Sequence, residues 1–238
     1  MDLSHKPRIV VLTGAGISAE SGLKTFRDSG GLWEEYDIMD VATPEGWQNN
    51  RDLVLRFYNE RRRQLETVAP NAAHKAIVLL EEHFNVDIIT QNVDDLHERA
   101  GSRHVMHLHG ELRKARSEKY PHLVYNIGTK DINSGDNCER GAQLRPDIVW
   151  FGEDVPLIPL AAEIVSRADI LIVVGTSLNV YPAAGLLYSA PYECRKYLVD
   201  PNESTNNVFN LEHIKAKAGT AMPVLVKRLI KELTTKNR

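Results

Sequence analysis

The chain carries the run Arg8-Ile-Val-Val-Leu-Thr13 directly before Gly14-Ala-Gly-Ile-Ser-Ala19. A short apolar run rich in β-branched side chains is typical of a strand that is buried on both faces of a parallel sheet. The segment that follows fits the pattern G-x-G-x-x-G/A, in which a tight turn lets the backbone approach a pyrophosphate at a helix N-terminus. Alone this pattern is weak, because an ordinary tight strand-to-helix turn can have the same sequence.

Further short apolar runs predict strands of the same kind, and helical patterns lie between them. The predicted strands are Val86–Thr90, Val105–Leu108, Ile170–Val174 and Arg195–Val199, and the predicted helices are Ala72–Phe84, Leu157–Arg167 and Met222–Thr234. Strands that alternate with helices indicate an α/β fold with a doubly wound, parallel, Rossmann-like sheet. Ligands bind such a sheet at the carboxyl ends of its strands, where polar or glycine-rich turns follow these runs.

Two stretches do not continue this alternation and predict a smaller inserted module. Residues 34–69 have a helical pattern, and residues 113–143 are polar, with glycines that interrupt any periodicity. We therefore expect a Rossmann-like domain that is formed by residues 1–34, 70–112 and 144–238. The inserted module then comprises residues 35–69 as a helical part and residues 113–143 as a ribbon-like part.

The composition is that of an ordinary globular protein of 238 residues, with 42% hydrophobic and 26% charged side chains. The formal net charge of −3 argues against non-specific electrostatic binding to nucleic acid, because such binding needs a basic surface. No apolar run reaches the roughly 18 residues that span a bilayer, so no membrane association is expected. Residues 1–7 have no leader pattern, and Cys138 and Cys194 are the two cysteines, which favours a cytoplasmic location.

The second predicted strand ends in Thr90-Gln91-Asn92-Val93-Asp94. Asn and Asp at such a position often form an Asx turn or cap a helix. Two amides and a carboxylate at a strand end are equally suited to bind a carboxamide and a ribose. The residues alone leave both interpretations open.

Three histidines lie in the segment His-Val-Met-His-Leu-His-Gly, at positions 104, 107 and 109. In an extended segment His107 and His109 share one face, which would suit a pair of metal ligands, but no third ligand stands at a diagnostic spacing. We favour structural roles for His104 and His107. Because His109 directly precedes Gly110 at a strand end, we expect it to act as a base.

Several segments, in order along the chain, resemble the motifs of the sirtuins, the NAD-dependent protein deacylases, in their bacterial type. The matching segments are Gly14–Ser18, Phe26–Asp28, Thr90–Asp94, His109–Gly110, Leu144–Glu153 and Gly175–Leu178, within a resemblance that extends from Ile9 to Ala218. The resemblance implies an enzyme that acts on acylated protein lysines. It would transfer the acyl group to ADP-ribose from NAD and release nicotinamide and O-acyl-ADP-ribose.

The resemblance also implies roles for individual residues. His109 would be the base, and Asn92 and Asp94 would be catalytic residues beside nicotinamide and its ribose. The implied cofactor contacts are Gly14, Ala15, Gly16, Ser18, Phe26, Arg27, Gln91, Asn92, Asp94, Gly175, Thr176, Ser177, Asn202 and Ala218. The implied substrate contacts Val149, Phe151 and Gly152 form an edge that would bind the peptide mainly through main-chain hydrogen bonds.

One departure from the family pattern concerns a metal. Sirtuins usually carry two Cys-x-x-Cys pairs that hold a structural zinc ion, and the corresponding positions here are Ser117, Tyr120, Asn137 and Arg140. None of these side chains is a thiolate, and Cys138 is out of phase with the expected pairs. We therefore expect NAD as co-substrate and no zinc, in a small module whose ribbon-like part is degenerate.

The helix predicted over residues 52–68 indicates which acyl group is removed. Its apolar side chains project within about 60° of Arg61, whereas Arg62 and Arg63 turn away and are expected to be solvated; these apolar residues are Val54, Phe57, Tyr58 and Leu65. A guanidinium on an apolar face calls for an anionic partner. Tyr58-x-x-Arg61 also resembles the marker of the sirtuin subgroup that removes succinyl and malonyl groups. We expect a desuccinylase and demalonylase that also deacetylates, with Tyr58 and Arg61 binding the acyl carboxylate.

The sequence leaves other functions open. The same NAD cleavage could serve protein ADP-ribosylation. The segment from Gly14 to Arg27, which matches the cofactor loop of the family, could also belong to a non-catalytic NAD-binding sensor. His107 and His109 could also serve a metal-dependent hydrolase, which would lose activity with a chelator and would need no NAD.

Overall fold

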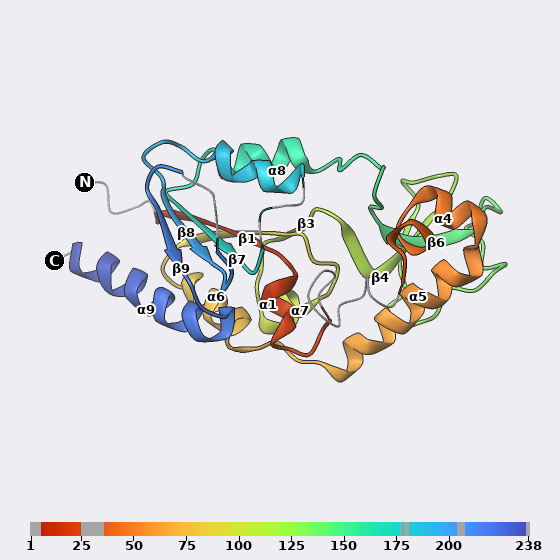
Figure 1. Ribbon diagram of the computed structural model, residues 1–238, viewed down its shortest axis with the longest axis horizontal. Helices are drawn as coiled ribbons and strands as arrows, with labels where there is room; N and C mark the ends of the chain where they lie inside the picture. Colours follow the sequence, from red (N-terminus) through yellow and green to blue (C-terminus); the bar gives the residue numbers. More distant parts are fainter. Residues whose placement is uncertain (1–5, 25–35, 177, 179–180, 204–207, 237–238) are drawn as a thin grey trace.

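The computed structural model describes residues 6–24, 36–176, 178, 181–203 and 208–236. Its larger part is a six-stranded sheet in the order β3-β2-β1-β7-β8-β9, in which all neighbouring strands are parallel (Figure 1). The strands are β1 (Arg8–Thr13), β2 (Asn85–Thr90), β3 (Val105–His107), β7 (Ile170–Val174), β8 (Arg195–Val199) and β9 (Leu211–Ile214). The predicted doubly wound, Rossmann-like sheet is confirmed.

Helices cover both faces of this sheet, which explains why residues 9–12 of β1 are all apolar. Ile9 and Val11 face a core formed with α6 and α9, whereas Val10 and Leu12 face a core formed with α8 and η2. Figure 1 shows these two helix layers on opposite sides of the strands. The helices of this part are α1 (Ala15–Ala19), α6 (Ala72–Leu80), α7 (Leu96–Ala100), α8 (Ile158–Val165), η2 (Ala183–Ser189) and α9 (Ala218–Lys236).

The smaller part packs helices against an antiparallel sheet in the order β5-β4-β6. Its elements are α3 (Ile38–Val41), α4 (Pro44–Asn49), α5 (Arg51–Gln64), η1 (Leu65–Thr67), β4 (Gly110–Ser117), β5 (Val124–Asn126) and β6 (Leu144–Ile148). The helices begin at side-chain caps: Thr43 accepts a hydrogen bond from Gly46 N before α4, and Asn50 accepts one from Leu53 N before α5. Trp47, Phe57 and Trp150 contribute to a core of their own.

The strand pairing shifts the limits of the inserted module. Residues 110–112 belong to β4 and residues 144–148 form β6, so both lie in the small sheet rather than in the large domain to which the sequence assigned them. The apolar-run criterion missed both strands because their sequences mix polar and apolar side chains. The short edge strand β9 was missed as well.

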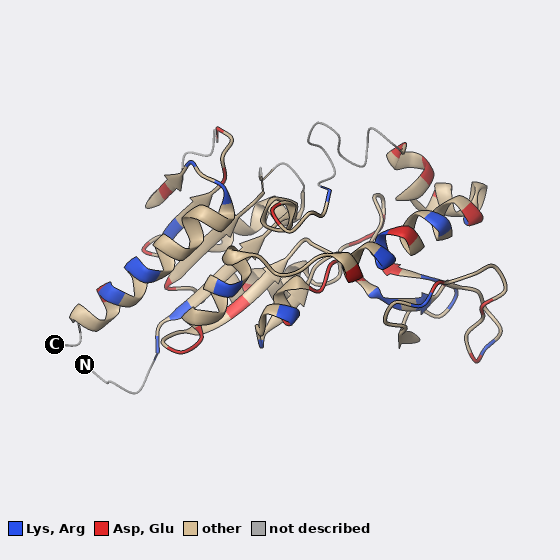
Figure 2. Ribbon diagram, turned by 90° about the horizontal axis from the view of Figure 1, so that it is seen from below, with Lys and Arg blue, Asp and Glu red and all other residues tan. Residues whose placement is uncertain are grey.

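Charged residues of both signs are interspersed over both parts of the chain (Figure 2). No helix among the described residues is long and apolar enough to cross a membrane.

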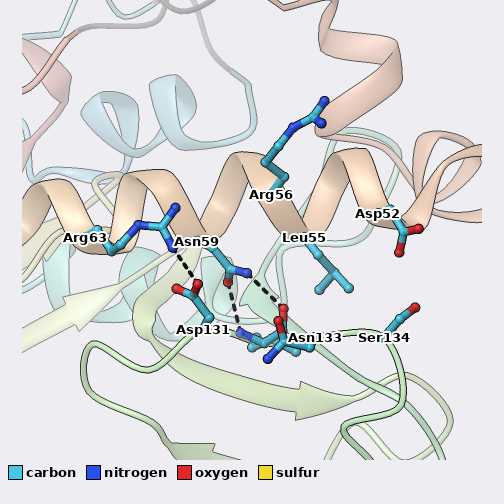
Figure 3. A pocket seen from close by; sticks show the side chains of 9 residues that line it. Asp52, Leu55, Arg56, Asn59, Arg63, Asp131, Asn133 and Ser134 are labelled. Atoms are coloured by element: carbon cyan, nitrogen blue, oxygen red, sulfur yellow. Dashed lines mark hydrogen bonds and ion pairs between the residues drawn. The ribbon is translucent and has the colours of Figure 1, made fainter.

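Arg62 corrects one expectation, because its side chain is fully buried rather than solvated. Its Nε donates to the carbonyl of Leu112 at 2.6 Å, and its Nη1 donates to Oδ1 of Asn59 at 2.7 Å. Asn59 in turn exchanges two hydrogen bonds with the backbone of Ile132, at 2.9 and 3.0 Å (Figure 3). The helix α5 is thus buried on two sides. A single apolar stripe predicts that the side carrying Arg62 is solvated, but β4 and residues 131–132 cover that side.

We predict that Arg62→Met lowers the free energy of unfolding by about 2–4 kcal/mol, because two buried acceptors lose a charged donor. The matched control is Arg63→Met on the same helix. Arg63 pairs with Asp131 at the surface, so its loss should cost less than about 1 kcal/mol. Urea unfolding followed by tryptophan fluorescence measures both, and equal losses would show that Arg62 does not tie α5 to β4.

Candidate active site

The loops after β1 and β7 meet where the strand order reverses direction, which is the usual ligand position in an open α/β sheet. Gly16 N donates to the carbonyl of Gly175 at 2.8 Å. A Cβ on Gly16 would lie 2.8 Å from Gly175 Cα, and a Cβ on Gly175, whose φ is +63°, would lie 2.3 Å from Ile17 N. Because neither loop can carry a side chain at this contact, the loops present bare backbone at the strand ends.

Beside this contact, a polar cluster joins the end of β2 to α1. Asn92 Nδ2 donates to the carbonyl of Gly14 and to Ser18 Oγ, both at 3.1 Å, and Ser18 Oγ donates to Asp94 Oδ2 at 2.9 Å. Asn92 and Asp94 are buried, and burial raises the pKa of the Asp94 carboxyl. Leu96 N donates to Asp94 Oδ1. Asp94 therefore does form the local turn, but it also lines a pocket together with Asn92.

That pocket brings together α1, the end of β2 and helix α5. Its lining residues are Ala15, Ser18, Leu23, Lys24, Arg61, Leu65, Asn92, Val93, Asp94 and Leu112. A second hollow, of about 220 Å³, lies between α5 and residues 131–134 and shares none of these residues (Figure 3). We place the candidate site in the first pocket, because it contains the polar groups at the strand ends.

His109 lies directly before β4, at the passage between the two parts of the chain. Its Nδ1 lies 3.0 Å from the carbonyl oxygen of Gln91. A carbonyl oxygen only accepts, so Nδ1 carries the proton and Nε2 of the neutral ring has a free lone pair. Burial lowers the pKa of His109, which keeps the ring neutral at physiological pH. The ring is thus prepared to accept a proton.

Gly110 fixes the chain direction after His109. Its φ is +82°, and a Cβ there would lie 1.9 Å from the carbonyl oxygen of Asp147 on β6. The carbonyl of His109 accepts a hydrogen bond from Val149 N at 2.9 Å. The candidate base and the predicted peptide-binding edge are therefore neighbours on one ladder.

Arg61 is buried, as its helical position predicted, and it lines the same pocket as Asn92 and Asp94. Its guanidinium carbon lies 5.5 Å from the centre of the Phe57 ring. Tyr58 is also buried, and burial raises its pKa to about 12. Its hydroxyl accepts a hydrogen bond from Trp150 Nε1 at 3.1 Å, and it is not among the residues that line the pocket.

The predicted peptide-binding edge is held by an ion-pair cluster that the sequence did not reveal. Glu153 accepts hydrogen bonds from Trp150 N at 2.8 Å and from Arg145 Nη1 at 2.7 Å, and it pairs with Arg116. Phe151 is exposed, Val149 is half-buried, and Gly152 has a φ of +89°. Arg116, Arg145 and Glu153 are far apart in the sequence and follow no regular spacing. Only the pairing of the strands shows that they form one cluster.

Those remaining predicted cofactor residues that the structure describes lie at or near the carboxyl ends of the strands. Gln91 Nε2 donates to Thr176 Oγ1 at 3.4 Å, which links the ends of β2 and β7. Asn202 follows β8 and is exposed, and Ala218 is buried at the start of α9. Phe26, Arg27 and Ser177 lie outside the described residues.

The four positions at which the family has zinc ligands make contacts of other kinds. Cys138 Sγ donates to Ser117 Oγ at 3.4 Å, so this cysteine, which the sequence places out of phase, does face the first of these positions. The Arg140 guanidinium lies 4.9 Å from the centre of the Tyr120 ring. Within the described ranges, no group of three or more His, Cys, Asp or Glu side chains is arranged to hold a metal ion.

Comparisons with known proteins agree with this geometry. The family model described as "Sir2 family" matches residues 14–182. An NAD-dependent protein deacylase of Helicobacter pylori strain J99 is 56% identical over 223 residues, which is 93% of this chain and 95% of the relative. The NAD-dependent protein deacylase of Escherichia coli strain K12 is 44% identical over 242 residues, which is 96% of this chain and 84% of that protein.

Solved structures give the same result. A mutant Sir2 homologue in complex with ADP-ribose superposes with a TM-score of 0.88 at 38% identity, covering 96% of this chain and 94% of the other. A Sir2 homologue in complex with NAD superposes with a TM-score of 0.85 at 38% identity, covering 96% and 91%. The resemblance seen in the sequence is therefore confirmed, and the chain belongs to the Sir2 family.

Proposed function

We propose that this chain is an NAD-dependent protein-lysine deacylase that prefers succinyl and malonyl groups and also removes acetyl groups. The observation that carries the acyl preference is the position of Arg61, a buried guanidinium in the same pocket as Asn92 and Asp94. The relatives named NAD-dependent protein deacylases support the reaction class. The products would be nicotinamide and the O-acyl ester of ADP-ribose.

The described residues fit NAD at the strand ends. The contact between Gly16 and Gly175 excludes side chains, so a pyrophosphate can approach the backbone there. Asn92 uses both of its amide protons on Gly14 and Ser18, which leaves its side-chain oxygen available as an acceptor for a carboxamide. When bound, NAD supplies the ribose carbon that loses nicotinamide and takes up the acyl oxygen.

His109 would act as the general base of this reaction. Its Nδ1–H is held by the Gln91 carbonyl, so Nε2 is oriented to take a proton from a ribose hydroxyl. The low pKa of the ring means that the base is present in its neutral form at working pH. Arg61 would bind the distal carboxylate of a succinyl or malonyl chain by charge-assisted hydrogen bonds. The edge at residues 149–152 would pair with the peptide main chain.

We predict that His109→Ala lowers the deacylation rate by roughly 10²–10⁴-fold while NAD binding persists. The matched control is His104→Ala, because His104 is exposed and does not line the pocket. In the wild type, kcat should fall on the acid side as Nε2 gains a proton. Because the pKa of His109 is lowered, this fall should lie below about pH 6.5. A His109→Ala variant within a few fold of the wild type would exclude the base role.

We also predict that the purified protein contains no stoichiometric zinc and keeps its activity with a chelator. Ser117 and Arg140 are not zinc ligands, and Tyr120 and Asn137 are poor replacements for thiolates. Elemental analysis of the protein, purified without chelator, measures this. About one zinc per chain would refute the prediction and would require ligands other than these four side chains.

For the acyl preference, we predict that Arg61→Met sharply lowers kcat/KM for a succinyl-lysine peptide and spares that for the acetyl-lysine peptide. Methionine keeps much of the apolar stem but removes the charge. Loss of one partner of a buried charged pair typically costs about 2–5 kcal/mol, or roughly one and a half to three and a half decades in kcat/KM.

The control for this experiment is Arg56→Met, since Arg56 is exposed on the same helix. Mass spectrometry with succinyl- and acetyl-lysine peptides, with and without NAD, gives both activities, and a melting curve reports stability. Parallel loss of both activities together with the melting temperature would mean that Arg61 is structural and would contradict the acyl preference.

A further inference from the structure

We propose that His107 is a positioning residue of the NAD site, and that a proton shared by His107 and Glu98 fixes the main chain of Asn92. The inference rests on the proposed function, because it takes Asn92 to contact NAD. His107 ends β3, its side chain is 6% exposed, and it lies behind the pocket rather than in its lining.

The peptide groups of Asn92 are held from two sides. Asn92 N donates to Thr90 Oγ1 at 3.0 Å, and its carbonyl oxygen lies 3.0 Å from His107 Nδ1. The other ring nitrogen, Nε2, lies 2.8 Å from Glu98 Oε1 on α7. One imidazole ring therefore bridges the main chain of Asn92 and the carboxylate of Glu98.

This arrangement requires a proton that a neutral ring and an ionised carboxylate do not supply. A carbonyl oxygen and a carboxylate both accept hydrogen bonds, so both ring nitrogens of His107 must donate if Glu98 is ionised. A neutral ring has only one N–H. Either the ring is an imidazolium or Glu98 is protonated, and in both cases the pair carries one extra proton.

The charges around the pair favour keeping this proton on the ring. Burial alone would lower the pKa of His107, but the hydrogen bond and charge of Glu98, together with the Asn92 carbonyl and the charge of Glu111, raise that pKa above its ordinary value. Further titratable or charged groups that face the ring from the neighbouring elements are His97 on α7, Asp94 before α7, and Glu111 on β4, which pairs with Lys114.

Loss of the proton at higher pH has a defined structural result. The single remaining N–H goes to the ionised carboxylate, because a charge-assisted hydrogen bond is about twice as strong as a neutral one. The Nδ1 lone pair then faces the carbonyl oxygen of Asn92, and that contact becomes repulsive. Because the folded-state pKa of His107 is raised, the stabilising contact is present at acidic pH and is lost as pH rises through the pKa of the pair.

The test measures NAD binding by calorimetry without acyl peptide, from about pH 6 to pH 9. We expect the wild type to bind NAD roughly two- to tenfold more weakly at the alkaline end, which corresponds to one hydrogen bond. Glu98→Gln should abolish this pH dependence, because the Gln amide can donate to Nε2 and leave the Nδ1 proton of a neutral ring on Asn92. Glu111→Gln is the matched control: it should keep a pH dependence, displaced to lower pH, since Glu111 acts on the ring only through its charge and is hydrogen-bonded to Lys114.

A second pair of variants separates positioning from folding. His107→Asn keeps an amide donor near the Nδ1 position and should bind NAD within about threefold of the wild type at acidic pH, without pH dependence, whereas His107→Ala should bind more weakly at every pH. Equal pH dependence in the wild type and Glu98→Gln would overturn the inference alone. A wild type that binds no NAD at any pH would overturn the proposed function as well. The titration of His109 is common to all these proteins and cancels in the comparison.

Discussion

The backbone contact between Gly16 and Gly175 is the constraint on which the site depends. It joins the ends of β1 and β7, the two central strands, at a distance that excludes a Cβ on either residue. The contact fixes the turn that begins α1. Ser18, which lies on α1, is thereby placed beside the end of β2. Ser18 can then bind both Asn92 and Asp94. The polar cluster follows from a close approach of two loops that only glycine permits.

The second part of the chain contributes to the same pocket because α5 is buried on two sides. Arg61 faces the strand ends, while Arg62 binds the Leu112 carbonyl and Asn59 within the small module. These adjacent residues on one helix therefore differ in role: Arg61 lines the candidate acyl site, whereas Arg62 attaches the helix to the rest of the small module. A buried guanidinium that satisfies backbone and amide oxygens joins segments distant in sequence, as a structural metal ion does in other modules of this size.

The sequence predicted the elements whose residues carry their own pattern. The strands β1 and β7 were predicted at their observed limits because they are apolar on both faces, and the burial of Arg61 followed from its helical position. The small sheet was missed because β4 mixes polar and apolar residues, and Arg62 was misassigned because a helical wheel shows no second covering surface. The contacts of Tyr58 with Trp150 and of His107 with Glu98 arise from tertiary packing, which no local spacing encodes.

The hydrogen bond from Val149 N to the His109 carbonyl has a mechanical consequence. A peptide that adds to the edge at residues 149–152 extends a ladder that already contains the peptide unit of His109. Hydrogen bonds in such a chain polarise one another, and each added strand restricts the motion of the next. A peptide that docked at the proposed edge would therefore stiffen the backbone from which the imidazole projects, and recognition of the main chain and alignment of the ring would be parts of one event.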